Sequence, residues 1–299
     1  MKKLRIGLEW FLNPDHLPLL IGMEKGWFEE VGLDIEMIEP TEHLDAVDAL
    51  ESGEMDLAIT EPIHLVEDGA RGKNVVGLAR FLHTNGGVMY FGGSAIERPR
   101  DMAGVRIQYP GAPGPGGPAI VKTMIEADGG SCDVEDFTAV NNGFYHTNAL
   151  IEDKADVATL VFYNFEVLEA RHRGHKAHFF ALKDWGIPDF CQLILIADST
   201  RLEERRDDFV AFIKVLSRGI DFLHQNPQDA KEIYFRRTGS DSDSELVTAI
   251  FDATVRTFTY DFTMSNDYYE VLENWMADHR LIPPQDSPRT YWSNELLFD

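Results

Sequence analysis

The sequence predicts a two-lobed α/β protein in which each lobe is a mostly parallel sheet flanked by helices, with a cleft between the lobes. The chain has 299 residues, enough for two domains that each bury a core of their own. Strand patterns alternate with helix patterns along the chain, which is typical of parallel sheets with right-handed crossovers. One pattern also occurs twice, at an offset of roughly 100 residues, which indicates two lobes of the same architecture.

The repeat consists of two stretches in each half of the chain. Residues 5–10 and 106–111 both begin with Arg-Ile and have the pattern of a short strand that runs into a loop. Residues 50–58 and 151–158 both match the end of a helix, a turn and a short apolar strand that begins after an Asp. We therefore expect these strands and turns to recur in both lobes.

Other patterns complete the first lobe. Apolar residues at helical spacing predict a helix over 17–26 that stops at its final glycine, and alternation predicts a strand over 33–38. We expect a further helix over 43–50 and a further strand over 75–81.

Helix and linker signals place the lobe boundaries. Lobe one is predicted to be discontinuous and to comprise residues 1–92 plus 194–299, whereas lobe two comprises 93–193. The hinges are then expected near 90–93, where two glycines supply backbone freedom, and near 192–196.

Composition excludes some partners. The hydrophobic fraction of 44% and the charged fraction of 26% are ordinary for a globular protein, and no apolar run is long enough to cross a bilayer. The formal charge of −24 repels nucleic acid and anionic lipid, so we exclude both as main partners. A small-molecule ligand remains compatible with this charge because local groups can oppose the global sign. A homodimer is also compatible with the sequence.

The N-terminus and the cysteines bear on the compartment. Two lysines follow Met1, but Glu9 and Asn13 interrupt the apolar stretch that a signal peptide needs. We expect a cytoplasmic protein, or a periplasmic one if a signal peptide has been removed. Cys132 and Cys191 have no metal-ligand spacing, so buried free thiols are expected, with a single disulfide as the alternative.

Ligands of open parallel sheets bind beyond the carboxyl ends of the strands, and this rule selects the loops of interest. In lobe one, Glu9 and Trp10 follow the first strand, where an aromatic face beside a carboxylate suits a flat heterocycle with an amino group. Asn13 or Asp15 is expected to cap the next helix, with His16 in its first turn. The alternative for each of these residues is a packing role.

A second loop of lobe one, residues 60–64, follows the next strand of the repeat. Its Pro fits the first turn of a helix, which would carry His64 towards the cleft. Thr60, Glu61 and His64 are therefore candidate ligand-binding residues. The sequence has no HExxH motif, no paired cysteines and no nucleophile elbow, so we predict no metal site.

Lobe two has a stretch rich in glycine and proline over residues 109–118, between a strand and a helix predicted over 119–127. Glycines let backbone amides approach an anion, although four prolines remove donors, so a stiff structural turn is the alternative. The candidate residues in this stretch are Tyr109, Gly111, Gly114 and Gly116.

Two polar and aromatic loops follow later strands of lobe two. Residues 141–146 include the candidate Asn142, and residues 162–166 correspond to the loop 60–64 of lobe one. In the second loop, Tyr163 is expected to stack on a planar ring and Glu166 to accept hydrogen bonds from ring amines.

Several short motifs resemble one known family. Their residues are Glu9-Trp10, His16, 24–28, 31–34, 39–41, 52–56, 63–64, 70–72, 136–140 and 190–191. Together they resemble the NMT1/THI5-like family, which includes the thiamine-pyrimidine (HMP-phosphate) synthases of fungi and the formyl-aminopyrimidine-binding proteins of ABC importers. The resemblance covers residues 5–225 and implies the type II periplasmic-binding-protein fold of the wider sulfonate-binding-like superfamily.

The resemblance also bears on activity. In the synthases, a lysine four residues before a histidine holds pyridoxal phosphate, and that histidine is consumed to build the pyrimidine. Here His64 matches the histidine, whereas Thr60 occupies the lysine position. We therefore predict a protein that binds an aminopyrimidine thiamine precursor, or a related planar heterocycle, in the cleft and needs no cofactor. The alternative is a synthase or divergent enzyme with His64 as the catalytic residue, and only that alternative would use pyridoxal phosphate.

Overall fold

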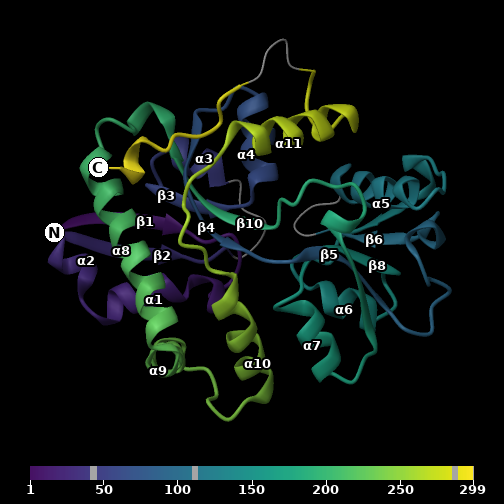
Figure 1. Ribbon diagram of the computed structural model, residues 1–299, viewed down its shortest axis with the longest axis horizontal. Coiled ribbons are helices and arrows are strands. Elements are labelled where there is room, and N and C mark those ends of the chain that lie inside the picture. The colour runs from purple at the N-terminus through teal and green to yellow at the C-terminus, as the bar shows by residue number, and fades with distance from the viewer. Residues whose placement is uncertain (41–45, 110–113, 285–288, 299) are drawn as a thin grey trace. The chain divides into compact units, whose positions relative to one another are not determined.

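The computed structural model describes residues 1–40, 46–109, 114–284 and 289–298 (Figure 1). The chain divides into two compact units. Unit 1 consists of Met1–His83, Gln192–Glu273 and Ile282–Asp299, and unit 2 consists of Thr84–Cys191 and Asn274–Leu281. Each unit contains one five-stranded sheet, which confirms the predicted α/β class with two sheets flanked by helices. The sheets are mixed and not mostly parallel, because two of the four strand pairings in each are antiparallel.

The sheet of unit 1 has the strand order β2-β1-β3-β10-β4. β1 pairs in parallel with β2 and β3, whereas β10 is antiparallel to both β3 and β4. The strands are β1 (Lys2–Gly7), β2 (Leu33–Ile38), β3 (Leu57–Thr60), β4 (Val75–His83) and β10 (Gln192–Asp198).

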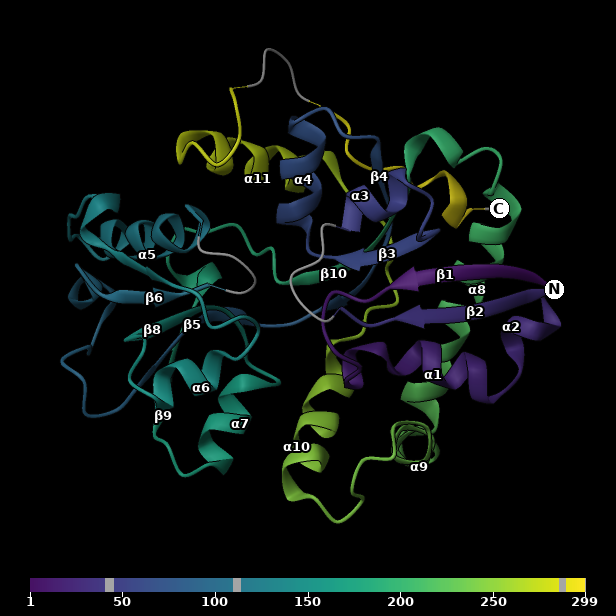
Figure 2. The same cartoon turned by 180° about the vertical axis from the view of Figure 1, so that it is seen from behind.

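Helices cover both faces of this sheet (Figure 2). On one face lie α1 (Leu17–Glu24), α8 (Arg206–Gln225) and α9 (Pro227–Thr238), and on the other lie α3 (Ala46–Glu51) and α4 (Pro62–Ala70). The remaining helices with residues in unit 1 are α2 (Trp27–Glu30), α10 (Glu245–Thr254) and α11 (Asn266–Asp278), of which α11 continues into unit 2 from Asn274.

Close packing of α1 on α8 depends on a glycine. A Cβ at Gly219 would lie 2.6 Å from the backbone oxygen of Pro18, closer than two such atoms can approach. The stacked rings of Phe28 and Phe212, 5.4 Å apart, fill the core next to this contact between the helices of unit 1. Unit 1 is therefore held together by segments that are distant in the sequence.

The sheet of unit 2 has the strand order β7-β6-β8-β5-β9. β6 pairs in parallel with β7 and β8, and β5 is antiparallel to β8 and β9. Helix α5 (Gly116–Ala127) lies on one face, and α6 (His146–Ile151) and α7 (Glu166–His172) lie on the other (Figure 1). The strands are β5 (Gly86–Phe91), β6 (Arg106–Gln108), β7 (Thr138–Val140), β8 (Val157–Phe162) and β9 (Ala177–Ala181).

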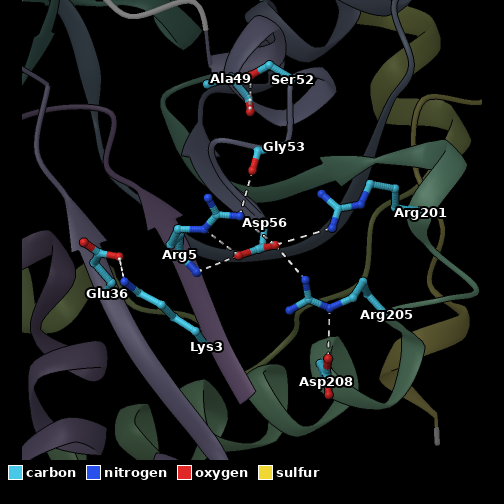
Figure 3. A network of polar contacts seen from close by, with 10 residues as sticks. All are labelled: Lys3, Arg5, Glu36, Ala49, Ser52, Gly53, Asp56, Arg201, Arg205 and Asp208. Carbon is cyan, nitrogen blue, oxygen red and sulfur yellow. Dashed lines mark hydrogen bonds and ion pairs between the residues drawn. The ribbon is translucent and has the colours of Figure 1, made fainter. Parts of the chain in front are cut away.

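The sequence repeat corresponds to a repeated polar clamp. In unit 1 the Asp56 carboxylate accepts from the backbone amide of Arg5 at 2.9 Å, while the Asp56 amide donates to the Arg5 carbonyl at 2.9 Å (Figure 3). In unit 2 the Asp156 carboxylate accepts from the Arg106 amide at 2.7 Å, and the Asp156 amide donates to the Arg106 carbonyl at 2.9 Å. In each repeat, the Asp that precedes the short strand thus holds this strand beside the first strand of the same repeat.

The structure differs from the sequence predictions at two boundaries. The chain passes between the units after His83 and Cys191, whereas the predicted lobe boundaries were 92/93 and 193/194, and it crosses twice more around the segment Asn274–Leu281. The predicted hinge 90–93 begins inside β5, whose residues pair with both β8 and β9 and so belong to unit 2. The two glycines of this segment predicted backbone freedom, but the hydrogen-bonded pairing of β5 with β9 continues up to the residue before them.

Two further details concern helices and cysteines. Helix α5 begins at Gly116 rather than at the predicted Ala119, because its first turn includes the glycines and a proline that were assigned to the loop. Cys132 and Cys191 are buried thiols that are not joined in a disulfide, as predicted. No helix in the described part of the chain is long and apolar enough to cross a membrane.

Candidate functional site

The carboxyl end of β1 carries a carboxylate held by a buried histidine. Glu9 Oε2 lies 3.0 Å from His16 Nε2, and His16 has no exposed surface, whereas 10% of the Glu9 side chain remains exposed. The Asn13 amide donates to His16 Nδ1 at 3.2 Å, so the proton of a neutral imidazole lies on Nε2 and is donated to Glu9. His16 therefore contacts Glu9 from the interior and orients it.

Asn13 builds this arrangement by capping the turn that contains His16. Its side-chain oxygen accepts from the Asp15 amide at 2.7 Å, as expected for one of the two predicted caps. Burial alone would lower the pKa of His16, but the Glu9 carboxylate outweighs this effect, and the pKa is raised. The turn thus maintains a charge-assisted pair beneath the sheet edge.

Trp10 follows Glu9 directly in the chain. Its ring is half-buried and packs against Phe11 with centroids 4.2 Å apart and planes inclined by 45°. Phe11 is 37% exposed, so the end of β1 presents aromatic surface next to a carboxylate. The use of this aromatic surface and carboxylate by a flat, amino-bearing ring stays a prediction.

The second predicted loop of unit 1 adds another carboxylate and histidine. Thr60 ends β3 with 7% of its surface exposed, and Glu61 precedes the helix α4 that begins at Pro62, as predicted. Glu61 Oε2 lies 3.5 Å from His64 Nε2, and His64 Nδ1 lies 3.9 Å from Glu67 Oε2. Because β1 and β3 are adjacent and parallel, the two groups share one edge of the sheet.

The pKa values reflect this crowding. Burial raises the pKa of Glu61, the Glu9 charge raises it further, and His64 opposes both effects. The pKa of His64 is also raised, because Glu67 and Glu61 outweigh the effect of burial. This edge of unit 1 is therefore rich in acceptors, and it suits a ligand that donates hydrogen bonds.

In unit 2 the glycine-rich stretch contacts the residue at the end of β6. A Cβ at Gly116 would lie 2.9 Å from Cε2 of Tyr109 and 3.0 Å from its hydroxyl oxygen, so the glycine is needed for this close approach. Gly114 is half-buried just before α5, and Gly111 lies outside the described residues. The described part of the stretch thus holds the Tyr109 ring against the start of α5.

Asn142 is engaged within its own part of unit 2. Its amide donates to Gln108 Oε1 at 2.9 Å, its side-chain amide donates to the Tyr145 carbonyl at 3.0 Å, and its side-chain oxygen accepts from Lys154 at 2.9 Å. These contacts use both ends of the side chain. Asn142 therefore shapes the loop after β7.

Tyr163 presents an exposed aromatic surface after β8. It is 37% exposed, its hydroxyl oxygen accepts from Arg171 at 3.1 Å, and its ring meets Phe179 edge-on at 5.3 Å. Glu166, three residues later, is buried, and its Oε2 accepts from the Phe162 amide at 2.9 Å. Glu166 Oε1 lies 3.9 Å from His146 Nε2. Residues 162–166 thus place an aromatic face and a carboxylate at one strand end.

Sequence reasoning missed three residues that shape these edges. Gln108 is fully buried and links the loops after β6 and β7, Arg171 holds Tyr163, and His146 lies behind Glu166. Only His146 had a sequence signal, as a histidine at a helix start after a polar loop. Among the residues that the structure describes, no group of three His, Cys, Asp or Glu side chains is arranged to hold a metal ion.

Comparison with solved structures defines the class of fold. The alkanesulfonate-binding protein SsuA from Xanthomonas axonopodis pv. citri matches with a TM-score of 0.75 at 14% identity, over 98% of both chains. The aliphatic sulphonate-binding protein SsuA from Escherichia coli matches with a TM-score of 0.72 at 13% identity, over 95% of this chain and 89% of the other. The protein thus has the two-lobed fold of periplasmic binding proteins.

The sequence places it more narrowly. The model of the NMT1/THI5-like family matches residues 13–230, and the chain belongs to this family. A formylaminopyrimidine-binding protein from Halalkalibacterium halodurans is 28% identical over 78% of this chain and 70% of its own length. A 4-amino-5-hydroxymethyl-2-methylpyrimidine phosphate synthase from Uromyces fabae is 27% identical over 99% of this chain and 87% of its own length.

Proposed function

We propose that this protein binds an aminopyrimidine of the thiamine-precursor type, or a related small planar heterocycle. The observation that carries the proposal is the Glu9–His16 pair at 3.0 Å beside Trp10. A carboxylate oriented from behind by a buried histidine keeps acceptor positions for a ligand amine, while the indole offers a stacking face. The family membership and the formylaminopyrimidine-binding relative support the ligand class.

The other proposed ligand-binding residues complete the two edges. In unit 1 they are Thr60, Glu61 and His64, and in unit 2 they are Tyr109, Tyr163, Glu166 and the glycine-rich stretch. His16 acts as a positioning residue because its ring contacts Glu9. Asn142 acts as a positioning residue because its side chain contacts Tyr145 and Lys154. A cytoplasmic location and a homodimer remain predictions from the sequence.

Titration calorimetry with 4-amino-5-hydroxymethyl-2-methylpyrimidine tests the proposal, and Glu9→Gln sharpens it. The substitution keeps the shape, removes the charge and replaces one acceptor by a donor. A charged hydrogen bond contributes about 1.5–3 kcal/mol, so affinity should fall by about tenfold or more. Tighter binding by Glu9→Gln would contradict the assignment of an amine-donating ligand. Only an anionic ligand near position 9 would bind more tightly once the negative charge of Glu9 is removed.

The synthases among the relatives make an enzyme of the same fold the alternative. Thr60 at the end of β3 carries a hydroxyl and no amine, so this position does not fit pyridoxal phosphate held through a lysine. We expect no covalent cofactor adduct. Incubation with pyridoxal phosphate, borohydride reduction and peptide mass spectrometry test this. A lysine adduct formed at stoichiometric cofactor would favour the synthase alternative.

A further inference from the structure

Gln108 is a buried amide at the end of β6 that the proposed function does not yet use. Its side chain has no exposed surface. It is the last residue of β6 and pairs in parallel with Val140, the last residue of β7. The loop that begins at Tyr109 and the loop 141–145 therefore leave the sheet of unit 2 at the same edge.

The side chain of Gln108 hydrogen-bonds the backbone of both loops. Its Nε2 donates to the Tyr109 carbonyl at 3.2 Å and to the Gly143 carbonyl at 2.9 Å. Its Oε1 accepts from the Asn142 amide at 2.9 Å. Two carbonyls face the nitrogen and one amide faces the oxygen, so the partners fix the orientation of the side-chain amide. One side chain thus pairs three backbone groups of two loops.

The loop 141–145 has little other support. None of its five residues is buried, so no side chain of its own anchors it in the core. Among the described residues, the other side chain outside the loop that hydrogen-bonds it is Lys154, which donates to Asn142 at 2.9 Å and is 49% exposed. An exposed hydrogen bond competes with water, whereas a buried one does not. The position of this loop therefore depends mainly on Gln108.

We propose that Gln108 is a positioning residue that holds both loops in their ligand-binding arrangement before the ligand binds. This inference rests on the proposed function and deepens it, because Tyr109 is a proposed ligand-binding residue and Asn142 positions its own loop. Loops that are already ordered cost no binding free energy to order. Gln108 thus acts on the ligand through the backbone of its neighbours and not by contact.

Two substitutions of Gln108 and one matched control test the proposal. Gln108→Met keeps the length of the side chain and removes all three hydrogen bonds. Gln108→Glu keeps an acceptor for the Asn142 amide, but its second oxygen can donate to a carbonyl only when the carboxyl is protonated. The control is Thr159→Val, because the buried Thr159 hydroxyl donates to the Gln108 carbonyl at 3.1 Å and contacts neither loop.

The first readout is the affinity for 4-amino-5-hydroxymethyl-2-methylpyrimidine by calorimetry, with thermal unfolding to confirm that each variant is folded. Gln108→Met should bind about tenfold more weakly than wild-type protein, and Thr159→Val should stay within about twofold of it. Relative to wild-type protein at the same pH, Gln108→Glu should bind progressively more tightly as pH falls from about 9 to about 6, because protonation restores one donor.

The second readout is hydrogen exchange of the Asn142 and Gly143 amides. In Gln108→Met without ligand they should exchange faster than in wild-type protein, and saturating pyrimidine should slow them again. Thr159→Val should exchange as wild-type protein does. Slowing by the ligand would show that binding orders a loop that Gln108 otherwise holds.

Three results would overturn the inference and leave the proposed function standing. They are wild-type affinity in Gln108→Met, equal weakening in Thr159→Val, and wild-type affinity of Gln108→Glu at every pH between about 6 and 9. The last result counts even if Gln108→Met does not fold. If wild-type protein binds no pyrimidine, the proposed function itself is overturned.

Discussion

The two units hold their repeated strands with the same clamp but at different depths. The Asp56 side chain of unit 1 is 2% exposed, whereas the Asp156 side chain of unit 2 is 37% exposed. Asp56 also accepts from Arg205 at 2.6 Å and lies 3.6 Å from Arg201, both from the segment that returns after β10 (Figure 3). The aspartate of unit 2 therefore contacts only its own repeat through this clamp, whereas the aspartate of unit 1 also holds the segment that follows β10.

The electrostatics of the two clamps follow from this difference. For Asp56, burial raises the pKa, but the hydrogen bonds from Arg5 and the charge of Arg205 outweigh it, so the pKa is lowered. For Asp156 the hydrogen bond from Arg106 is the main cause of a lowered pKa. Both aspartates stay ionised at pH 7, but only the loss of Asp56 would remove a buried carboxylate that contacts Arg5, Arg201 and Arg205 together.

The largest expected effect comes from removing the aspartate of each clamp in turn. Asp56→Ala should destabilise the protein by about 3–5 kcal/mol, the range for removing one partner of a buried ion pair. Asp156→Ala should cost about 1 kcal/mol, because its ion pair is solvent-screened and mainly one backbone hydrogen bond is lost. Denaturant unfolding at pH 7 measures both variants. Equal losses in the free energy of unfolding would show that the contacts of Asp56 with the segment after β10 do not stabilise the protein.

The histidine–carboxylate pairs differ between the units in a way that pH can test. In unit 2 the folded pKa of His146 is about 4, below the unfolded value near 6.5. The unfolded chain therefore binds the proton first, and stability is lost as pH falls from about 6.5 towards 4. In unit 1 the pKa of His16 is raised, so its contribution is complete below pH 6.5 and is lost as pH rises through the folded pKa.

His146→Gln should therefore protect the protein from acid. Relative to this variant, the wild-type protein should lose about 3 kcal/mol between pH 7 and pH 4, at about 1.4 kcal/mol per pH unit. His16→Gln should give a difference of opposite sign, with the wild-type advantage shrinking as pH rises. Urea unfolding across this pH range measures both. A pH-independent difference for His146→Gln would mean that the histidine is accessible to protons in the folded state.

The architecture could be predicted from the sequence because the signals are local. Alternation gave β2 at its observed bounds, and Pro62 marked the start of α4. The repeated Asp before β3 and β8 gave the two-unit organisation, since each Asp bonds its own repeat. The unit boundaries could not be placed because they depend on the pairing of β5 with β8 and β9, which are distant in sequence.

The candidate site was predicted only as far as strand ends reveal it. Glu9 and Trp10 could be chosen because they follow β1, but the burial of His16 behind Glu9 depends on a capped turn and on packing. Asn142 was chosen for its loop position, whereas its side chain serves that loop. His146 was passed over because its position at a helix start does not reveal the tertiary burial that lowers its pKa.

The smallest expected effect compares the aromatic surfaces at the two strand ends. Trp10 packs on Phe11 and remains half-buried, whereas Tyr163 is held by Arg171 and Phe179 and is 37% exposed. Both rings are expected to stack on a heterocycle, and an aromatic ring stacked on a base contributes about 1–3 kcal/mol. Trp10→Ala should therefore weaken aminopyrimidine binding by about that amount, with Tyr163→Ala towards the lower end, because a more exposed ring desolvates less of the ligand.

Calorimetry gives the affinities, and thermal unfolding shows whether the fold is kept. Arg171→Met is the matched variant for Tyr163, because it leaves the ring in place and removes the guanidinium that contacts the Tyr163 hydroxyl and ring. If Trp10→Ala lowers the unfolding temperature and leaves affinity unchanged, Trp10 is a packing residue and the stacking surface must be sought in unit 2 alone.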